Sequence, residues 1–136
     1  MRKAWLGVLG AVAVTACGSP SADLFAVKRS GAGPGAAVAM VVSDDGTVRC
    51  NGAAPAALPA ARLLDARDLA RRLAKQAALG LELPPGPAAD TTFRYRADLA
   101  DGRIAFADSS RGLPRSFSDL AGFVRVVSRQ VCKLRR

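Results

Sequence analysis

The stretch that decides the fold is FRYRADLADGRIAFAD, residues 93–108. Its first half alternates between polar and apolar side chains, with the apolar ones at Phe93, Tyr95, Ala97 and Leu99. This period of two predicts a β-strand with one buried face. Asp101-Gly102 then predicts a tight turn, because glycine supplies the positive φ that such turns need. Residues 103–108 are expected to return as the paired strand, with their own apolar side chains on the same buried face.

Three further strands are expected nearer the N-terminus. Residues 24–29 form the first, and residues 30–35 follow as a loop dense in glycine and proline. Residues 37–43 carry one period-two apolar set, at Val38, Met40 and Val42. The sequence DDG at 44–46 predicts the turn of a second hairpin, whose return strand covers residues 47–50.

Two helices are predicted. Strong helix formers fill residues 61–79, and Gly80 is expected to cap the C-terminal end. The apolar residues of this segment recur at spacings of three and four, at Leu63, Ala66, Ala70, Leu73 and Ala77. Ser116 with Asp119 predicts a capping box at the start of the second helix. Its buried stripe is expected at Phe117, Leu120, Val124, Val127 and Val131. The Ala- and Pro-rich residues 53–59 are predicted to be a spacer.

The predicted element order is therefore β-β-β-α-β-β-α. Short connections within the hairpins imply antiparallel pairing, and two amphipathic helices can cover one face of the resulting sheet. The expected fold class is α+β, with two layers and an antiparallel sheet of about five strands. The chain has 136 residues, which suits one domain. We place that domain at residues 24–136.

The N-terminal segment has the pattern of an export signal. Arg2 and Lys3 precede an apolar run over residues 5–14, which is too short to span a bilayer. The run closes with VTAC at residues 14–17, which resembles the lipobox of bacterial lipoproteins. This resemblance implies cleavage before Cys17 and transfer of a diacylglyceryl group to its thiol. Two acyl chains would then give stable membrane anchoring.

The lipobox predicts three segments: a lipoprotein signal peptide at 1–16, a lipidated cysteine with its tether at 17–23, and the domain at 24–136. It implies a location at the cell membrane, on the extracytoplasmic face, with the covalent lipid on Cys17 as the only prosthetic group. The Ala/Arg/Gly/Pro bias also looks like that of small lipoproteins from high-GC bacteria. The alternative is an ordinary signal peptide with a chance cysteine, cleaved near Ala16 or Ser19.

Two cysteines remain once Cys17 is assigned to the lipid. Outside the cytoplasm, two leftover cysteines most often form a disulfide, here between Cys50 and Cys132. That bond would pin the last helix to the sheet. Two free thiols or a two-ligand metal site are the alternatives, and no third ligand stands nearby in the sequence.

Charge and composition exclude several classes of function. The net charge is +9, and +7 without Arg2 and Lys3, so the anchored domain is expected near anionic headgroups. Exported proteins rarely meet nucleic acid, and we expect none as a partner. The sequence has no histidine, which removes Ser-His-Asp and Cys-His pairs and the commonest zinc ligand. We therefore expect a monomer without catalytic activity, metal ion or small-molecule substrate.

Arginines provide the best candidate for anion binding. Arg94, Arg96 and Arg103 are expected to share the outer face of the hairpin at 93–108. Ordinary solvated strand positions are the alternative explanation. The glycine-rich loop at 30–35 lacks the Gly-Lys-Ser/Thr ending of a phosphate-binding loop, so we do not expect it to hold a nucleotide.

With its elements laid out, the chain resembles emfourin-type proteins, which inhibit thermolysin-like metalloproteases. The resemblance rests on RSG at 29–31 before a glycine-containing loop, FRYR at 93–96, DG at 101–102, and LP at 113–114. It implies a non-enzymatic domain that binds a secreted or envelope protease. The expected contact segment comprises Ser30, Gly31, Gly33 and Gly35. Ala32 and Pro34 depart from the family loop, which is richer in glycine and aromatic residues, so no inhibitory residue is carried over.

Two functions are thus compatible with the sequence. The first is a membrane-anchored module that binds a protein, as an inhibitor does. The alternative is an envelope-associated lipoprotein whose arginine-rich faces bind anionic lipid or polymer. Salt discriminates between them, because purely electrostatic surface binding fades with ionic strength, whereas a packed protein interface persists.

Overall fold

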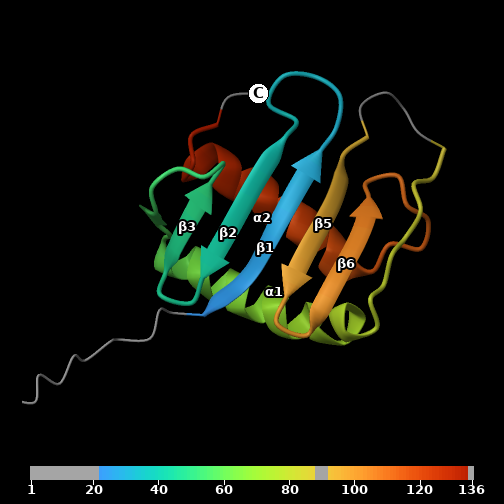
Figure 1. Ribbon diagram of the computed structural model, residues 1–136, viewed down its shortest axis with the longest axis horizontal. Coiled ribbons are helices and arrows are strands. Elements are labelled where there is room, and N and C mark those ends of the chain that lie inside the picture. The colour runs from blue at the N-terminus through green and yellow to red at the C-terminus, as the bar shows by residue number, and fades with distance from the viewer. Residues whose placement is uncertain (1–21, 88–91, 135–136) are drawn as a thin grey trace, which may run out of the picture.

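The computed structural model describes residues 22–87 and 92–134 (Figure 1). Its elements are β1 (Asp23–Ser30), β2 (Val38–Ser43), β3 (Thr47–Cys50), β4 (Ala56–Ala57), α1 (Ala60–Ala78), β5 (Arg94–Leu99), β6 (Gly102–Ala107) and α2 (Arg115–Gln130). The predicted signal peptide at 1–16 and the predicted lipidation site Cys17 lie outside the described residues. Within those residues, neither helix is both long and apolar enough to cross a membrane.

The strands form one sheet in the order β4-β3-β2-β1-β5-β6, and every neighbouring pair is antiparallel. The α+β class is confirmed, with six strands where about five were expected. The extra strand, β4, lies in the predicted spacer and pairs with Thr47 and Val48. It is held in place by Leu58, which is buried and whose backbone N–H donates to the Gly46 carbonyl at 2.8 Å. A two-residue strand of alanines has no periodicity by which the sequence could reveal it.

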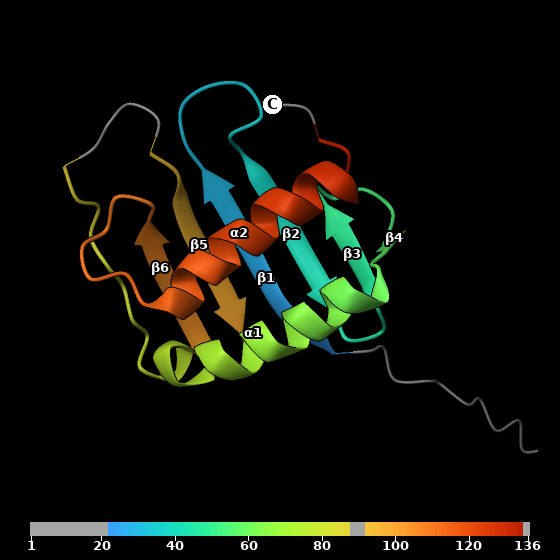
Figure 2. The same ribbon diagram turned by 180° about the vertical axis from the view of Figure 1, so that it is seen from behind.

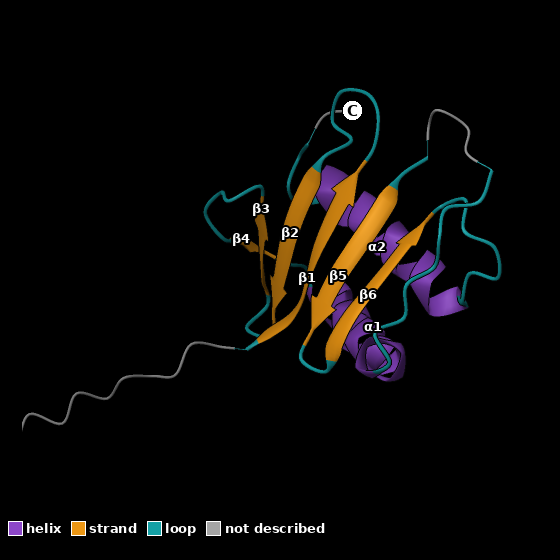
Figure 3. Ribbon diagram, turned by 45° about the vertical axis from the view of Figure 1, so that its right-hand side comes forward, coloured by secondary structure: helices purple, strands orange, loops and turns teal. Residues whose placement is uncertain are grey.

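Both helices cover the same face of the sheet and leave the other face open (Figures 2 and 3). The core lies between the two layers, and its largest fully buried side chains include Phe25, Met40, Leu73, Ile104 and Phe117. The predicted stripes were largely right, but Leu69 and Phe123 are buried as well, while Leu63, Ala70 and Val131 are only partly buried. The buried strip of each helix is therefore displaced slightly from the predicted one.

The predicted capping box of the second helix is wrong. Helix α2 follows Pro114 directly, and no side chain caps its first turn. Pro114 is the N-cap residue, with an extended ψ of 145°, and its carbonyl accepts hydrogen bonds from the N–H groups of Phe117 and Ser118 at 3.0 and 3.3 Å. The early start places Ser116 inside the first turn, where it is buried. Asp119 instead accepts a hydrogen bond from Arg72 of α1 at 2.7 Å, and so links the two helices.

The outer edge of β6 is covered by the chain that leaves α1. The backbone N–H of Leu83 donates to the Ala105 carbonyl at 2.8 Å, and that of Ala105 donates to the Leu81 carbonyl at 3.1 Å. Covering an edge in this way removes the unpaired backbone groups through which sheets aggregate. The turn before β6 meets the end of α1 so closely that a Cβ on Gly102 would lie 2.1 Å from the Ala77 carbonyl oxygen.

Cys50 and Cys132 are paired in the structure as a disulfide, with their Cα atoms 6.0 Å apart. That separation is ordinary for a disulfide. The bond joins the end of β3 to the residue just beyond the last turn of α2. It therefore ties the second helix to the half of the sheet that lies farthest from β5 and β6.

Candidate functional site

The glycine-rich loop connects β1 to β2 at the end of the sheet where α2 also ends (Figure 1). Residues 31–35 are exposed, whereas Ala36, which closes the loop, is 3% exposed. Gly33 and Gly35 have φ of 95° and 74°, a region in which other residues are strained. Gly33 and Gly35 are therefore needed for the loop to adopt its backbone conformation.

Arg29, the next-to-last residue of β1, braces this loop from inside. Its Nε donates to the Ala36 carbonyl at 3.0 Å, and its Nη2 donates to the Gly35 carbonyl at 3.0 Å. The guanidinium also lies over the Phe93 ring, 4.7 Å from the centroid. Two hydrogen bonds and a cation–π contact on one side chain hold the loop in a defined shape.

A hollow of about 570 Å³ opens between the loop and the end of α2. The loop residues from Ala32 to Ala36 line one side, and the helical residues Arg125 and Arg129 line the other. Phe93 and Arg29 also line it. The hollow thus offers an apolar ring and several guanidinium groups, which suit the carbonyl or carboxylate oxygens of a bound polypeptide.

A carboxyl and a phenol lie beside this hollow, in an adjoining one of about 380 Å³. Burial raises the pKa of the Tyr95 hydroxyl, and the nearby charge of Asp108 raises it further. Partial burial likewise raises the pKa of Asp108, while a backbone hydrogen bond from Phe93 and the charges of Arg125 and Arg29 oppose that rise. The group Arg29, Tyr95, Asp108 and Arg125 thus links the loop, the sheet and α2 electrostatically.

The structure brings the predicted contact residues together at this end of the sheet. Gly31 packs so closely on Phe93 that a Cβ there would lie 2.7 Å from the ring, and Ser30 is exposed as the last residue of β1. The sequence did not reveal the bracing role of Arg29 and Phe93. The available signal is an arginine just before a glycine-rich loop together with an aromatic residue just before another strand. The two can be connected only once the pairing of β1 with β5 is known.

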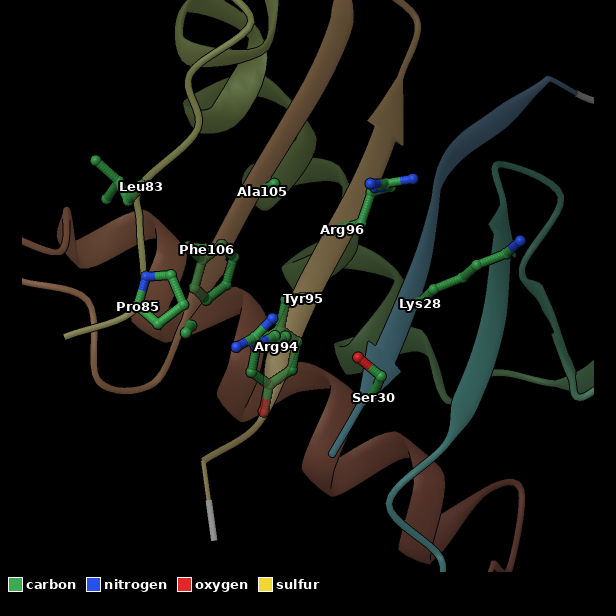
Figure 4. Close-up of a pocket in the computed structure, with 10 residues that line it drawn as sticks. Lys28, Ser30, Leu83, Pro85, Arg94, Tyr95, Arg96, Ala105 and Phe106 are labelled. Atoms are coloured by element: carbon green, nitrogen blue, oxygen red, sulfur yellow. The ribbon is translucent and has the colours of Figure 1, made fainter. Parts of the chain in front are cut away.

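The three arginines predicted to bind anions lie on the open face of the sheet, but they are not equivalent. Arg103 donates from Nε to Asp98 Oδ1, so it has a carboxylate partner. Arg94 and Arg96 line a hollow of about 460 Å³ together with Lys28 (Figure 4). Lys28 was not singled out from the sequence, because its position opposite Arg96 follows from the β1–β5 register.

No group of three or more His, Cys, Asp or Glu side chains within residues 22–87 and 92–134 could hold a metal ion. Comparison of the chain with models of protein families, with curated proteins and with solved structures gave no match. The lipobox and the emfourin-like pattern therefore stay predictions.

Proposed function

We propose that this protein is a membrane-anchored extracytoplasmic lipoprotein whose small domain binds another protein, in the manner of a protease inhibitor and without catalysis. The observation that carries the proposal is the loop between β1 and β2, exposed at residues 31–35 and braced by Arg29 through two hydrogen bonds of 3.0 Å. A secreted or envelope protease is the partner that the emfourin-like pattern favours.

The bracing matters because binding costs free energy when a loop must first be ordered. A loop that is already held in shape avoids much of that cost, which is the principle of preorganisation. Arg29 holds the loop from its inner side, so the outer side of residues 31–35 stays free for contact. The adjoining hollow of about 570 Å³ gives room for one or two side chains of a partner.

The position of the loop also suits an anchored protein. The proposed anchor at Cys17 leads into β1 at Asp23, and the loop follows the other end of the same strand. A β-strand rises about 3.3 Å per residue, so the eight residues of β1 put Asp23 about 25 Å from the start of the loop. The chain therefore enters the sheet at the end opposite the contact segment.

Cys17→Ser tests the anchor. We expect the full chain, produced in a bacterium that processes lipoproteins, to incorporate labelled palmitate and to sediment with membranes. The Cys17→Ser variant should do neither, because it lacks the thiol that accepts the lipid. The matched control replaces Cys50 and Cys132 by serine and keeps Cys17, so it should still incorporate the labelled palmitate. Label in Cys17→Ser, or an unlabelled secreted wild type, would refute the anchor.

Ala32→Glu tests the loop. Stoichiometric inhibition is expected when the wild-type chain is titrated against secreted proteases that include a thermolysin-like metalloprotease. A charged side chain at exposed Ala32 should weaken inhibition at least about tenfold, since a buried unpaired charge is costly at an interface. Ala100→Glu, in the turn at the opposite end of the sheet, is the matched control and should inhibit like the wild type.

Two results of the protease titration would contradict the proposal. If the wild type inhibits no protease of the panel, the protein is not an inhibitor of these enzymes. Equal inhibition by the wild type and Ala32→Glu rejects the loop as the contact segment. Raised salt gives a further check, because inhibition through a packed interface should persist, whereas electrostatic attraction alone is screened.

A further inference from the structure

The two layers of the protein differ in how their positive charges are compensated. Every arginine of α1 is ion-paired, through Arg62–Asp65 at 2.8 Å, Arg67–Asp44 at 2.7 Å, Arg71–Asp68 at 3.3 Å, Arg72–Asp68 at 2.7 Å and Arg72–Asp119 at 2.7 Å. The positive charge of α1 is therefore largely neutralised by carboxylates of the helix itself and of two other elements, the β2–β3 turn and α2.

The open face of the sheet is not neutralised in this way. Lys28 on β1, Arg49 on β3, and Arg94 and Arg96 on β5 are all exposed. None of them makes an ion pair with any part of the chain that the structure describes. We call these four side chains the basic face. Arg103 lies on the same side but is paired with Asp98.

Two of these cations are opposed directly. Lys28 and Arg96 are partners in the β1–β5 register, and like charges at directly opposite positions of an antiparallel pair destabilise it. Neither side chain forms an ion pair with a carboxylate within the residues that the structure describes. An external anion would relieve this repulsion.

The basic face is spread out and lies among small side chains. Its neighbours on the open face include Ala26, Ala39 and Ala105, which are half-buried and project little. Figure 4 shows Lys28, Arg94 and Arg96 extending in different directions from their strands and not converging on one point. Such an array suits a surface that carries many anions, and it suits a single small ligand poorly.

We propose that the open face of the sheet docks on the anionic lipid headgroups of the membrane through Lys28, Arg49, Arg94 and Arg96. This docking proposal depends on the proposed function because it assumes that Cys17 carries the lipid anchor. Cys17 and Asp23 are six positions apart in the sequence, and a chain of that length spans at most about 20 Å. The domain would thus stay close to the headgroups, and each basic residue near an anionic surface contributes about 1 kcal/mol of attraction there.

Vesicle binding tests the docking without the anchor. The probe is a full chain carrying Cys17→Ser, mixed with vesicles of phosphatidylglycerol and phosphatidylcholine or of phosphatidylcholine alone. The measured quantity is the preference for the anionic vesicles. Lys28→Gln/Arg94→Gln/Arg96→Gln should lower that preference about a hundredfold, since three surface charges are lost.

The matched control is Arg62→Gln/Arg71→Gln/Lys75→Gln on α1. It removes the same net charge from the opposite layer, and its preference should stay within about threefold of the parent, because these residues would point away from the membrane. Equal losses in the two variants would overturn the proposal, since net charge alone would then explain binding. So would the absence of any preference for anionic vesicles, or a sheet-face dimer that forms without lipid.

A label on each layer gives a second measurement that needs no charge change. Spin labels at Ala39→Cys, on the open face, and at Leu64→Cys, which is 63% exposed on α1, are compared in the Cys17→Ser chain. Anionic vesicles should shield the label at 39 from a water-soluble relaxation agent and leave the label at 64 accessible. Shielding of 64 alone, or of neither, would overturn the docking while leaving the loop assay unaffected.

Discussion

Replacement of Cys50 and Cys132 by alanine is expected to lower the free energy of unfolding by about 4 kcal/mol. The two residues are 82 positions apart, so the bond closes a long loop and removes much of the conformational freedom of the unfolded chain. A domain of this size has a total stability of about 5–15 kcal/mol. Loss of the bond therefore takes a large share of it.

The measurement is urea denaturation of the Cys17→Ser chain with and without the two alanines. Reduction of the disulfide in the parent chain is the control, because it opens the same loop and keeps both sulfur atoms. The two perturbations should shift the midpoint alike. An unchanged midpoint in both would mean that the bond does not constrain the unfolded chain, and a loss only in the alanine variant would point to the missing sulfur atoms.

Phe117→Ala is expected to cost about 3–5 kcal/mol, the range for deleting a buried aromatic ring. Phe117 is 0% exposed. Its ring centroid lies 4.9 Å from that of Phe106, which in turn stacks on Tyr95 at 4.9 Å. This row of three rings joins α2 to β6 and β5, so its loss leaves a cavity between the two layers.

Phe117→Leu is the matched control. It keeps an apolar side chain of similar bulk and should cost less than about 1.5 kcal/mol. Thermal unfolding followed by near-ultraviolet circular dichroism of Tyr95 reports both stability and ring packing. If the two variants lose the same free energy of unfolding, Phe117 does not stabilise the protein by filling the space between the layers.

The local elements of this fold could be predicted because their signals lie within a few residues. Strand β5 alternates polar and apolar residues from Arg94 to Leu99, and the burial of Tyr95 and Ala97 follows that alternation. The turn at 44–46 and the strand Thr47–Cys50 were also located correctly. Backbone sterics and the period of apolar side chains act over these short distances, so the sequence alone predicts the strands and turns.

The arrangement in space could not be predicted in the same way. Nothing in the local pattern says that β1 lies between β2 and β5, and this neighbour relation decides the candidate sites. It places the Arg29 guanidinium over the Phe93 ring and Lys28 opposite Arg96. Charge pairing was also hidden, because the partner of Arg67 is Asp44, on a turn distant in sequence. An ion pair between elements so far apart in the chain has no signal in the local spacing of charges.

The place of β1 inside the sheet has a mechanical consequence. Its hydrogen bonds run to β2 on one side and to β5 on the other. If the proposed anchor pulled at Asp23 and the proposed partner resisted at the loop after Ser30, the force would act on the two ends of this one strand. The covalent backbone of β1, which is already extended, would then carry the load, and the ladders to β2 and β5 would be sheared little. Under the proposed function, tension is therefore expected to pass along β1 without unfolding the rest of the domain.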